Sequence, residues 1–192
     1  RRQSVDVTAK CDNCHGQLSM HGANRTDEGQ VCVICHNPNA TDIGRRPADH
    51  TVTATFDGKK EESIDFKRMI HGIHGAAKRE VPYTVWGFGN TEHVFGPEEV
   101  TFPGILNNCT ACHVGSAYTL PLVDGVLGST IDTDPSAATK AQATTTALQE
   151  PADDLNISPT AAVCSACHDS DLAKTHMRQN GGSFAVLQDN IE

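Results

Sequence analysis

Cysteine and histidine recur in this chain at one fixed spacing. All eight cysteines of the 192 residues fall in four pairs with two residues between the members, and a histidine directly follows each pair. The four motifs are Cys11-Asp-Asn-Cys14-His15, Cys32-Val-Ile-Cys35-His36, Cys109-Thr-Ala-Cys112-His113 and Cys164-Ser-Ala-Cys167-His168. C-x-x-C-H is the attachment signature of c-type haem, because the two thiols can form thioethers with the two vinyl groups of one porphyrin and the histidine then lies over the iron. The sequence therefore predicts four covalently bound haems c, attached through the eight cysteines, with the proximal iron ligands His15, His36, His113 and His168.

A zinc site and redox-active disulfides are the alternative interpretations of these cysteines. The first two pairs have the spacing C-x2-C-x17-C-x2-C, which falls within the template of a four-thiolate zinc site. Vicinal thiols can also form redox disulfides. Neither alternative requires a histidine after every second cysteine, and 51 residues separate Cys112 from Cys164, which fits the zinc template badly. Covalent haem is the favoured interpretation.

The second axial ligand of each iron decides what such haems do. Histidine on both sides gives a low-spin, low-potential haem and methionine raises the potential, whereas an open position would allow catalysis. Six histidines lie outside the motifs, and His50, in a polar loop, is expected to be solvated. We expect four of the remaining five to be distal ligands: His21, His71, His74, His93 and His176. Three methionines close to these histidines are expected to pack against porphyrins: Met20, Met69 and Met177.

Short elements are expected to position the distal histidines. Apolar residues recur at roughly helical spacing between residues 61 and 75, which predicts a helix that carries His71 and His74. Residues three positions apart leave a helix about 60° apart, so the two imidazoles can bind two different irons. The alternative is that one of these two histidines is an iron ligand and the other lies on the surface. The Gly-rich segment 86–95 predicts a hairpin at His93, and His176 follows the fourth motif at helical spacing.

The composition indicates a fold that depends on buried cofactor. Leu, Ile, Val and Phe together number 38 of 192 residues, and the formal net charge is −9, a combination close to that of disordered chains. Four apolar macrocycles would supply the missing core, so we expect the haem-free chain to be largely unfolded. The expected fold is loop-rich, with short α-helices, at most a small β-hairpin and a core built around four haems. We expect one tetrahaem domain over residues 1–192, which could be a segment of a larger multihaem protein.

Charge and hydropathy exclude further classes. An acidic chain is a poor nucleic-acid binder, because phosphate contacts need clustered Lys and Arg. No apolar run approaches the length of a membrane-spanning helix, and residues 1–10 are too polar for a secretory signal. Haem attachment requires export, so we expect a location outside the cytoplasm.

Four segments resemble the MtrC/OmcA-type outer-membrane decahaem cytochromes: residues 11–22, 32–40, 65–74 and 102–109. The chain looks most similar to a multihaem domain from the C-terminal half of such a protein. The resemblance implies a cell-surface cytochrome with His/His-ligated haems that passes electrons to ferric minerals and flavins. It also implies other multihaem cytochromes as partners and a position on the extracellular face of the outer membrane. The family's multihaem domains carry five haems, whereas this chain has four motifs, which fits a surplus distal histidine.

The leading functional prediction is an electron carrier, not an enzyme, that relays single electrons through closely packed haems. A multihaem reductase with one open haem is an alternative that a surplus of histidines disfavours. A periplasmic shuttle with the same chemistry is another, and the residues alone do not separate it from a surface protein. The haem potentials, the physiological acceptor and the unligated histidine are left open by the sequence.

Overall fold

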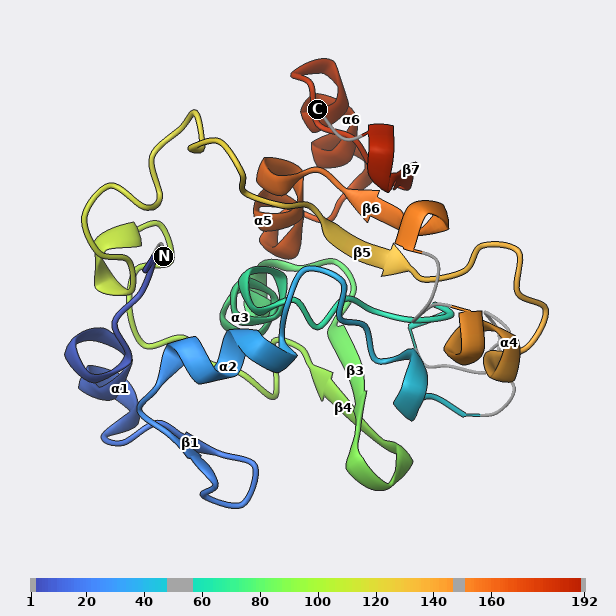
Figure 1. The fold of residues 1–192 in the computed structure, drawn as a ribbon. Helices are drawn as coiled ribbons and strands as arrows, with labels where there is room; N and C mark the ends of the chain where they lie inside the picture. The colour runs from blue at the N-terminus through green and yellow to red at the C-terminus, as the bar shows by residue number, and fades with distance from the viewer. Residues whose placement is uncertain (1–2, 48–56, 147–150, 191–192) are drawn as a thin grey trace. The chain divides into compact units, whose positions relative to one another are not determined.

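The computed structural model describes residues 3–47, 57–146 and 151–190, in which short helices and strands are joined by long loops (Figure 1). The α-helices are α1 (Asp12–His15), α2 (Gly29–Cys35), α3 (Phe66–His74), α4 (Lys140–Thr146), α5 (Pro159–Cys167) and α6 (Asp171–Gln179). The strands are β1 (Ser19–Met20), β2 (Arg25–Thr26), β3 (Tyr83–Gly87), β4 (Thr91–Phe95), β5 (Ser129–Asp132), β6 (Leu155–Ile157) and β7 (Val186–Leu187). A π-helix over Val7–Cys11 and several single-turn 3-10 helices complete the regular structure. The predicted loop-rich fold with short helices is confirmed.

The strands form three small antiparallel sheets, which is more β-structure than the single hairpin predicted. β1 pairs with β2, β3 pairs with β4, and the third sheet has the order β5-β6-β7. The hairpin at His93 is confirmed, with His93 opposite Val85. The third sheet was missed because its strands lack apolar alternation. Its neighbouring strands are instead joined by polar side chains, as where the Thr130 hydroxyl donates to Asn156 Oδ1 at 3.0 Å.

The chain forms two compact units, and the first has almost no protein core. It comprises Arg1–His36 and Pro103–Val126 and contains three of the four motifs. Among its described residues, 3–36 and 103–126, Val7 is the only buried one. Large apolar side chains are exposed instead, such as Ile34 at 70% and Ile105 at 72%. The helices and strands of this unit therefore form with little burial of the unit's own side chains.

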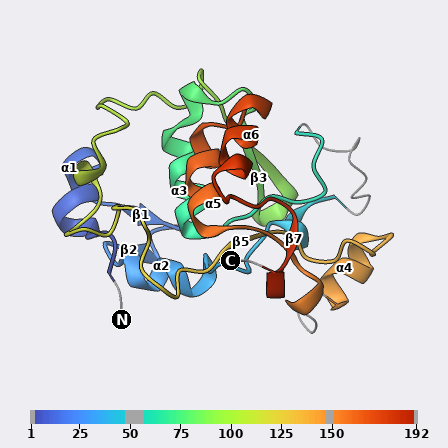
Figure 2. The same cartoon turned by 90° about the horizontal axis from the view of Figure 1, so that it is seen from above.

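The second unit, Asn37–Phe102 and Leu127–Glu192, has a conventional packed centre. Helices α3 and α5 lie side by side in both views (Figures 1 and 2). Beside α5, Ile157 packs with Ala161 and Ala162. On the other side of α3, Gly72 lies against the Tyr83 ring, where a Cβ would come within 2.9 Å of Cδ2. Small residues thus set the distance at which α3 and its histidines are held.

Buried charges occupy much of the second unit where apolar side chains would be expected. Arg46, fully buried, bonds Asp42 at 2.9 Å and Asp57 at 3.1 Å. Arg68 bonds Glu62 at 2.9 Å, and both are more than nine-tenths buried. Such pairs tolerate burial only when both partners are present and hydrogen-bonded. The scarcity of large aliphatic residues noted in the sequence is therefore partly offset by ionic contacts.

The assignment of residues 1–192 to one tetrahaem domain stays a prediction.

Candidate functional site

Each C-x-x-C-H motif lies at the C-terminal end of a short helical element. The first ends α1, the second ends α2, the third contains the 3-10 turn Cys109–Ala111, and the fourth ends α5. In the last three motifs the histidine N–H donates to the carbonyl of the first cysteine, each time at 2.9 Å. A helical turn places residues i, i+3 and i+4 on one face, so the two thiols and the imidazole leave the same side of the turn. This local geometry is what thioether attachment with proximal ligation requires.

Side chains before the motifs fix where these helical turns begin. Asp6 Oδ1 accepts from Ala9 N at 2.9 Å at the start of the π-helix before the first motif. Glu28 Oε1 accepts from Gln30 N at 2.9 Å at the start of α2. Pro159 is the first residue of α5, where its missing N–H costs nothing. The chain thus specifies the position of these turns through ordinary capping.

The first and third motifs are neighbours within the first unit, although 97 residues separate Cys11 from Cys109. Val5 and His113 form an isolated antiparallel β-bridge, and Lys10 Nζ donates to the Thr110 carbonyl at 2.9 Å. Burial raises the pKa of the Cys11 thiol, and the nearby Cys112 thiol raises it further. No local pattern in the sequence indicates this contact, because it joins segments that are far apart in the chain.

His21 faces the histidine of the second motif. It lies in the turn between β1 and β2, and its ring centroid is 6.1 Å from that of His36, with 19° between the ring planes. An imidazole nitrogen binds a metal at about 2 Å, and the ring centroid lies about 1 Å beyond the nitrogen. Two imidazoles on opposite sides of one iron therefore have centroids about 6 Å apart. The pair has the separation that one bis-histidine iron would need.

Helix α3 buries a charged and a small residue more completely than its apolar residues. The predicted helix over residues 61–75 is confirmed as Phe66–His74, but its buried residues are Arg68 and Gly72. Four apolar residues of the stripe are only half-buried: Phe66, Met69, Ile70 and Ile73. A helix with its charged and small face inside has an apolar face left for something else to cover.

The orientation of His71 suits a metal ligand. Its Nδ1 lies 2.6 Å from the Lys67 carbonyl, so Nδ1–H donates there and Nε2 is left to point away from the helix. Metal-binding histidines usually have their second nitrogen fixed by such a backbone carbonyl. The His74 ring meets the edge of Phe102, with centroids 5.7 Å apart.

The fourth motif packs directly against the end of α3. Cys167 Sγ lies 3.4 Å from the His71 carbonyl, within a weak hydrogen bond. A Cβ on Gly75 would overlap this sulfur and would lie 3.2 Å from Cys167 Cβ. Arg68 Nη1 donates to Ser165 Oγ at 3.1 Å, between the two cysteines of the motif. The fourth C-x-x-C-H motif and the helix with His71 and His74 are thus one packed assembly.

The two remaining distal candidates are exposed. His93 lies on β4, and its ring covers Gly87, where a Cβ would be 2.7 Å from Nε2. His176 lies on the outer face of α6, one turn after Leu172, whose side chain is 82% exposed. His50 lies outside the described residues.

The residues around the motifs fit a bound haem. In the first unit, apolar side chains beside the motifs are exposed, including Met20 at 51% and Ile34 at 70%. The Tyr118 ring lies 6.0 Å from that of His113. Flat apolar macrocycles attached to these motifs would cover such side chains and supply the core that the first unit lacks.

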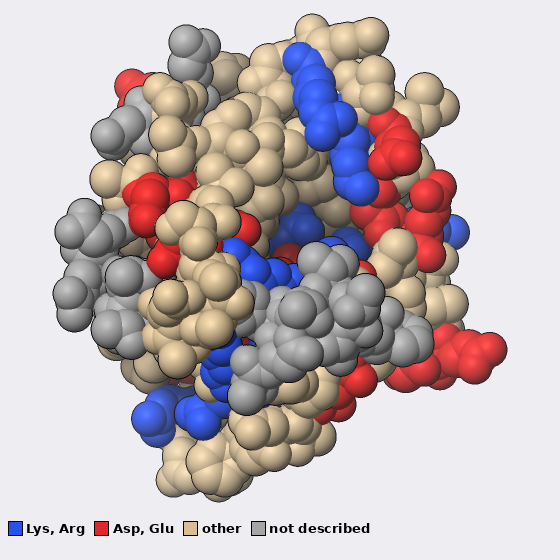
Figure 3. All heavy atoms as spheres, turned by 90° about the vertical axis from the view of Figure 1, so that its right-hand side faces the viewer, with Lys and Arg blue, Asp and Glu red and all other residues tan. Residues whose placement is uncertain are grey.

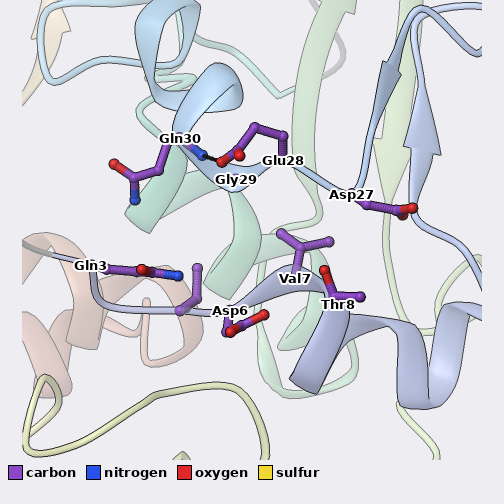
Figure 4. A pocket seen from close by; sticks show the side chains of 9 residues that line it. Gln3, Asp6, Val7, Thr8, Asp27, Glu28, Gly29 and Gln30 are labelled. Carbon is purple, nitrogen blue, oxygen red and sulfur yellow. Dashed lines mark hydrogen bonds between the residues drawn. The ribbon is translucent and has the colours of Figure 1, made fainter.

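A cavity of about 110 Å³ in the first unit contains none of the motif residues (Figure 4). Its carboxylates belong to Asp6, Asp27 and Glu28, and two of these cap helices as described above. Asp27 Oδ2 accepts from Gln17 Nε2 at 2.8 Å. These groups are explained by local structure.

Three further observations concern alternative sites. All eight cysteines lie in the described part of the chain and are free thiols there. The described residues contain no group of three or more His, Cys, Asp or Glu arranged to hold a metal ion. No helix in the described ranges has both the length and the apolar character needed to cross a bilayer.

The chain was compared with known proteins. The family model for the outer membrane cytochromes of MtrC/MtrF-like type, domains II/IV, matches residues 2–192. No match was found among curated proteins or among solved structures. Because the family model covers nearly the whole sequence, the resemblance inferred from the motif segments is confirmed, and the chain belongs to the MtrC/MtrF-like outer membrane cytochromes.

Proposed function

We propose that this chain is a tetrahaem electron-transfer domain that relays single electrons between four bis-histidine haems c. Membership of an outer membrane cytochrome family supports haem-based electron transfer and a non-enzymatic role. The count of four rests on the four C-x-x-C-H motifs. The proposed location is the extracellular face of the outer membrane, with the periplasm as the alternative. Other multihaem cytochromes are the proposed partners, and ferric minerals or flavins the proposed acceptors.

The observation that carries the proposal is the first unit's lack of a protein core. Three haem-attachment motifs lie among 58 described residues of which only Val7 is buried. A unit of this size cannot offset its chain entropy without buried apolar surface. Covalent haem at three motifs would supply that surface, whereas zinc or disulfides would leave the apolar side chains exposed.

The haems supply one-electron chemistry, and the chain's own residues hold and tune them. The proposed proximal ligands His15, His36, His113 and His168 each follow the cysteines that fix the porphyrin. His21 is proposed as the distal ligand opposite His36, on the 6.1 Å separation of the two rings. His71 is proposed as a distal ligand because its Nδ1–H is fixed by the Lys67 carbonyl.

The remaining distal ligands are proposed from His74, His93 and His176, of which one would be surplus. Histidine on both sides closes each iron and favours a low potential. A closed iron excludes the substrate binding that a reductase requires, which separates the relay from the enzyme alternative.

The first experiment is the absorption spectrum of the dithionite-reduced holoprotein before and after addition of carbon monoxide. We expect low-spin bands that carbon monoxide leaves unchanged, because all four irons are closed. A carbon monoxide complex at about a quarter of the haem in the unaltered protein would indicate one open iron and would favour the reductase.

The assignment of His21 is tested by H21A. Removing this imidazole is expected to open one iron of four, so that carbon monoxide changes the Soret band of about a quarter of the haem. H50A is the control, since His50 is expected to be solvated. An H21A protein that stays insensitive to carbon monoxide would exclude His21 as a ligand.

A further inference from the structure

A pocket in the second unit is strongly basic, although the chain as a whole carries a net charge of −9. The cavity has a volume of about 100 Å³. Its charged lining consists of Lys59, Arg68, Arg79, Lys174 and Asp169. In Figure 3, Lys and Arg side chains (blue) lie on the rim and in the depth of a hollow in the face shown. Four cations therefore converge on a space with one acidic lining residue.

The ion pairs around the pocket leave positive charge in excess. Glu62 is shared, because it bonds both Lys59 and Arg68. Asp169 bonds Arg79 at 3.4 Å. Among the described residues, two buried carboxylates are thus bonded by three of the four lining cations. The remaining pair, between Lys174 and Asp171, spans 3.9 Å to a fully exposed carboxylate and contributes little.

The arginines and the lysines of the pocket differ in how they are held. Arg79 is held in place by the Val81 carbonyl at 2.9 Å and by the Ala166 carbonyl. Burial lowers the pKa of Arg79, which the carboxylates of Asp169 and Glu62 raise and the Arg68 charge lowers. The side chains of Lys59 and Lys174 are about a third exposed, at 36% and 34%, so an anion that enters the pocket can reach them.

We propose that this pocket binds a phosphate group, either as inorganic phosphate or as the phosphate of a monoester ligand. A dianion suits a cavity that four basic side chains line, and ammonium and guanidinium groups are the usual phosphate donors in proteins. The cavity volume admits a tetrahedral oxyanion but no large ligand. The arginines supply a fixed field, and Lys174 and Lys59 supply the donors at the mouth.

The pocket adjoins the fourth haem-attachment motif. Ser165, between Cys164 and Cys167, lines it, and Arg68 bonds the Ser165 hydroxyl at 3.1 Å. Negative charge placed there opposes addition of an electron nearby, so phosphate lowers the reduction potential of the fourth haem. This consequence rests on the proposed function, whereas phosphate binding does not.

Binding is tested by calorimetric titration of the holoprotein with inorganic phosphate, in a background of chloride at constant ionic strength. The matched variants are K174Q, which removes a pocket cation, and K78Q, which removes the charge of exposed Lys78 outside the pocket lining. We expect saturable one-site binding that K174Q weakens about tenfold and K78Q leaves unchanged. No saturable binding at millimolar phosphate, or equal weakening in both variants, would overturn the proposal.

Two further measurements identify the source and the consequence. Methyl phosphate that binds at least as tightly as inorganic phosphate supports a phosphorylated ligand, and clearly weaker binding supports free phosphate. Redox titration is then repeated with phosphate present. If phosphate binds the oxidised fourth haem state ten times more tightly than the reduced state, one haem potential falls by about 59 mV. Phosphate binding with unchanged potentials would refute the link to the fourth motif but not the pocket.

Discussion

The substitution G75A tests whether the end of α3 positions the fourth haem-attachment motif. Gly75 follows α3 directly, and a Cβ built there overlaps Cys167 Sγ. The same Cβ would lie 3.2 Å from Cys167 Cβ and 2.9 Å from the His71 carbonyl oxygen. Ordinary carbon contacts are about 3.5–4.0 Å, so the two helices must separate by at least a few tenths of an ångström.

The expected cost of this overpacking is about 1–3 kcal/mol in the free energy of unfolding. For a chain of this size, each kcal/mol lowers the melting temperature by roughly 2–4 °C, so the melting temperature of G75A should fall by roughly 2–12 °C. Displacement of the Cys167 sulfur should also impair thioether formation. A fraction of the protein should therefore carry three covalent haems in place of the proposed four.

The assay combines thermal unfolding of the holoprotein with intact-mass measurement of covalently bound haem. G44A is the control, because a Cβ on Gly44 meets no atom within 4 Å and the substitution adds the same methyl group. A G75A protein with the melting temperature and haem content of G44A would show that the packing of Cys167 against α3 is not required.

Three other predictions concern buried polar groups of the second unit. Burial raises the pKa of Glu61 from 4.5 to about 7, so the folded state keeps a proton that the unfolded state has lost. The stability that this group contributes is therefore full below pH 4.5 and is lost as the pH rises through 7, by up to about 3 kcal/mol. Urea unfolding at pH 5 and at pH 8 should show this decline in the parent protein and a smaller decline in E61Q. Equal declines in the two proteins would contradict the prediction. R68M removes one of the two cations that bond the buried Glu62 carboxylate and should cost up to about 3–5 kcal/mol, which R68M/E62L should largely restore; a double variant no more stable than R68M would count against this account. Y83F removes the donor to the Ser63 carbonyl, a bond of 2.6 Å in a fully buried site, and should cost about 1–3 kcal/mol in chemical unfolding; a change near zero would mean that the carbonyl finds another donor.

The local chemistry of this protein is contained in its sequence. The four motifs specify their own geometry, because one helical turn suffices to bring two cysteines and a histidine to one face. The helix of His71 and the hairpin of His93 were also predicted, since both follow from short-range patterns of apolar and glycine residues. The family could be inferred from the motif segments for the same reason.

Contacts between distant segments could not be predicted from the sequence. The adjacency of the first and third motifs depends on Val5 meeting His113 and Lys10 meeting Thr110, with no shared pattern between them. The sheet of β5, β6 and β7 was missed because polar side chains join its strands. The proposed pairing of His21 with His36 likewise needed the distance between their rings.

The clearest difference between sequence and tertiary structure is the burial of α3. Its apolar stripe predicted which residues form the helix, but an amphipathic pattern does not say which face turns inward when part of the core is cofactor. Tertiary structure decided that Arg68 and Gly72 face the protein, because Glu62 pairs with the arginine and Tyr83 needs the space of a glycine. The sequence by itself determined the four C-x-x-C-H motifs and their local helical geometry, since both depend on neighbouring residues. Only the fold decided which charges are buried, because even a pair that is close in the sequence, such as Arg68 and Glu62, is buried by contact with the distant helix α5.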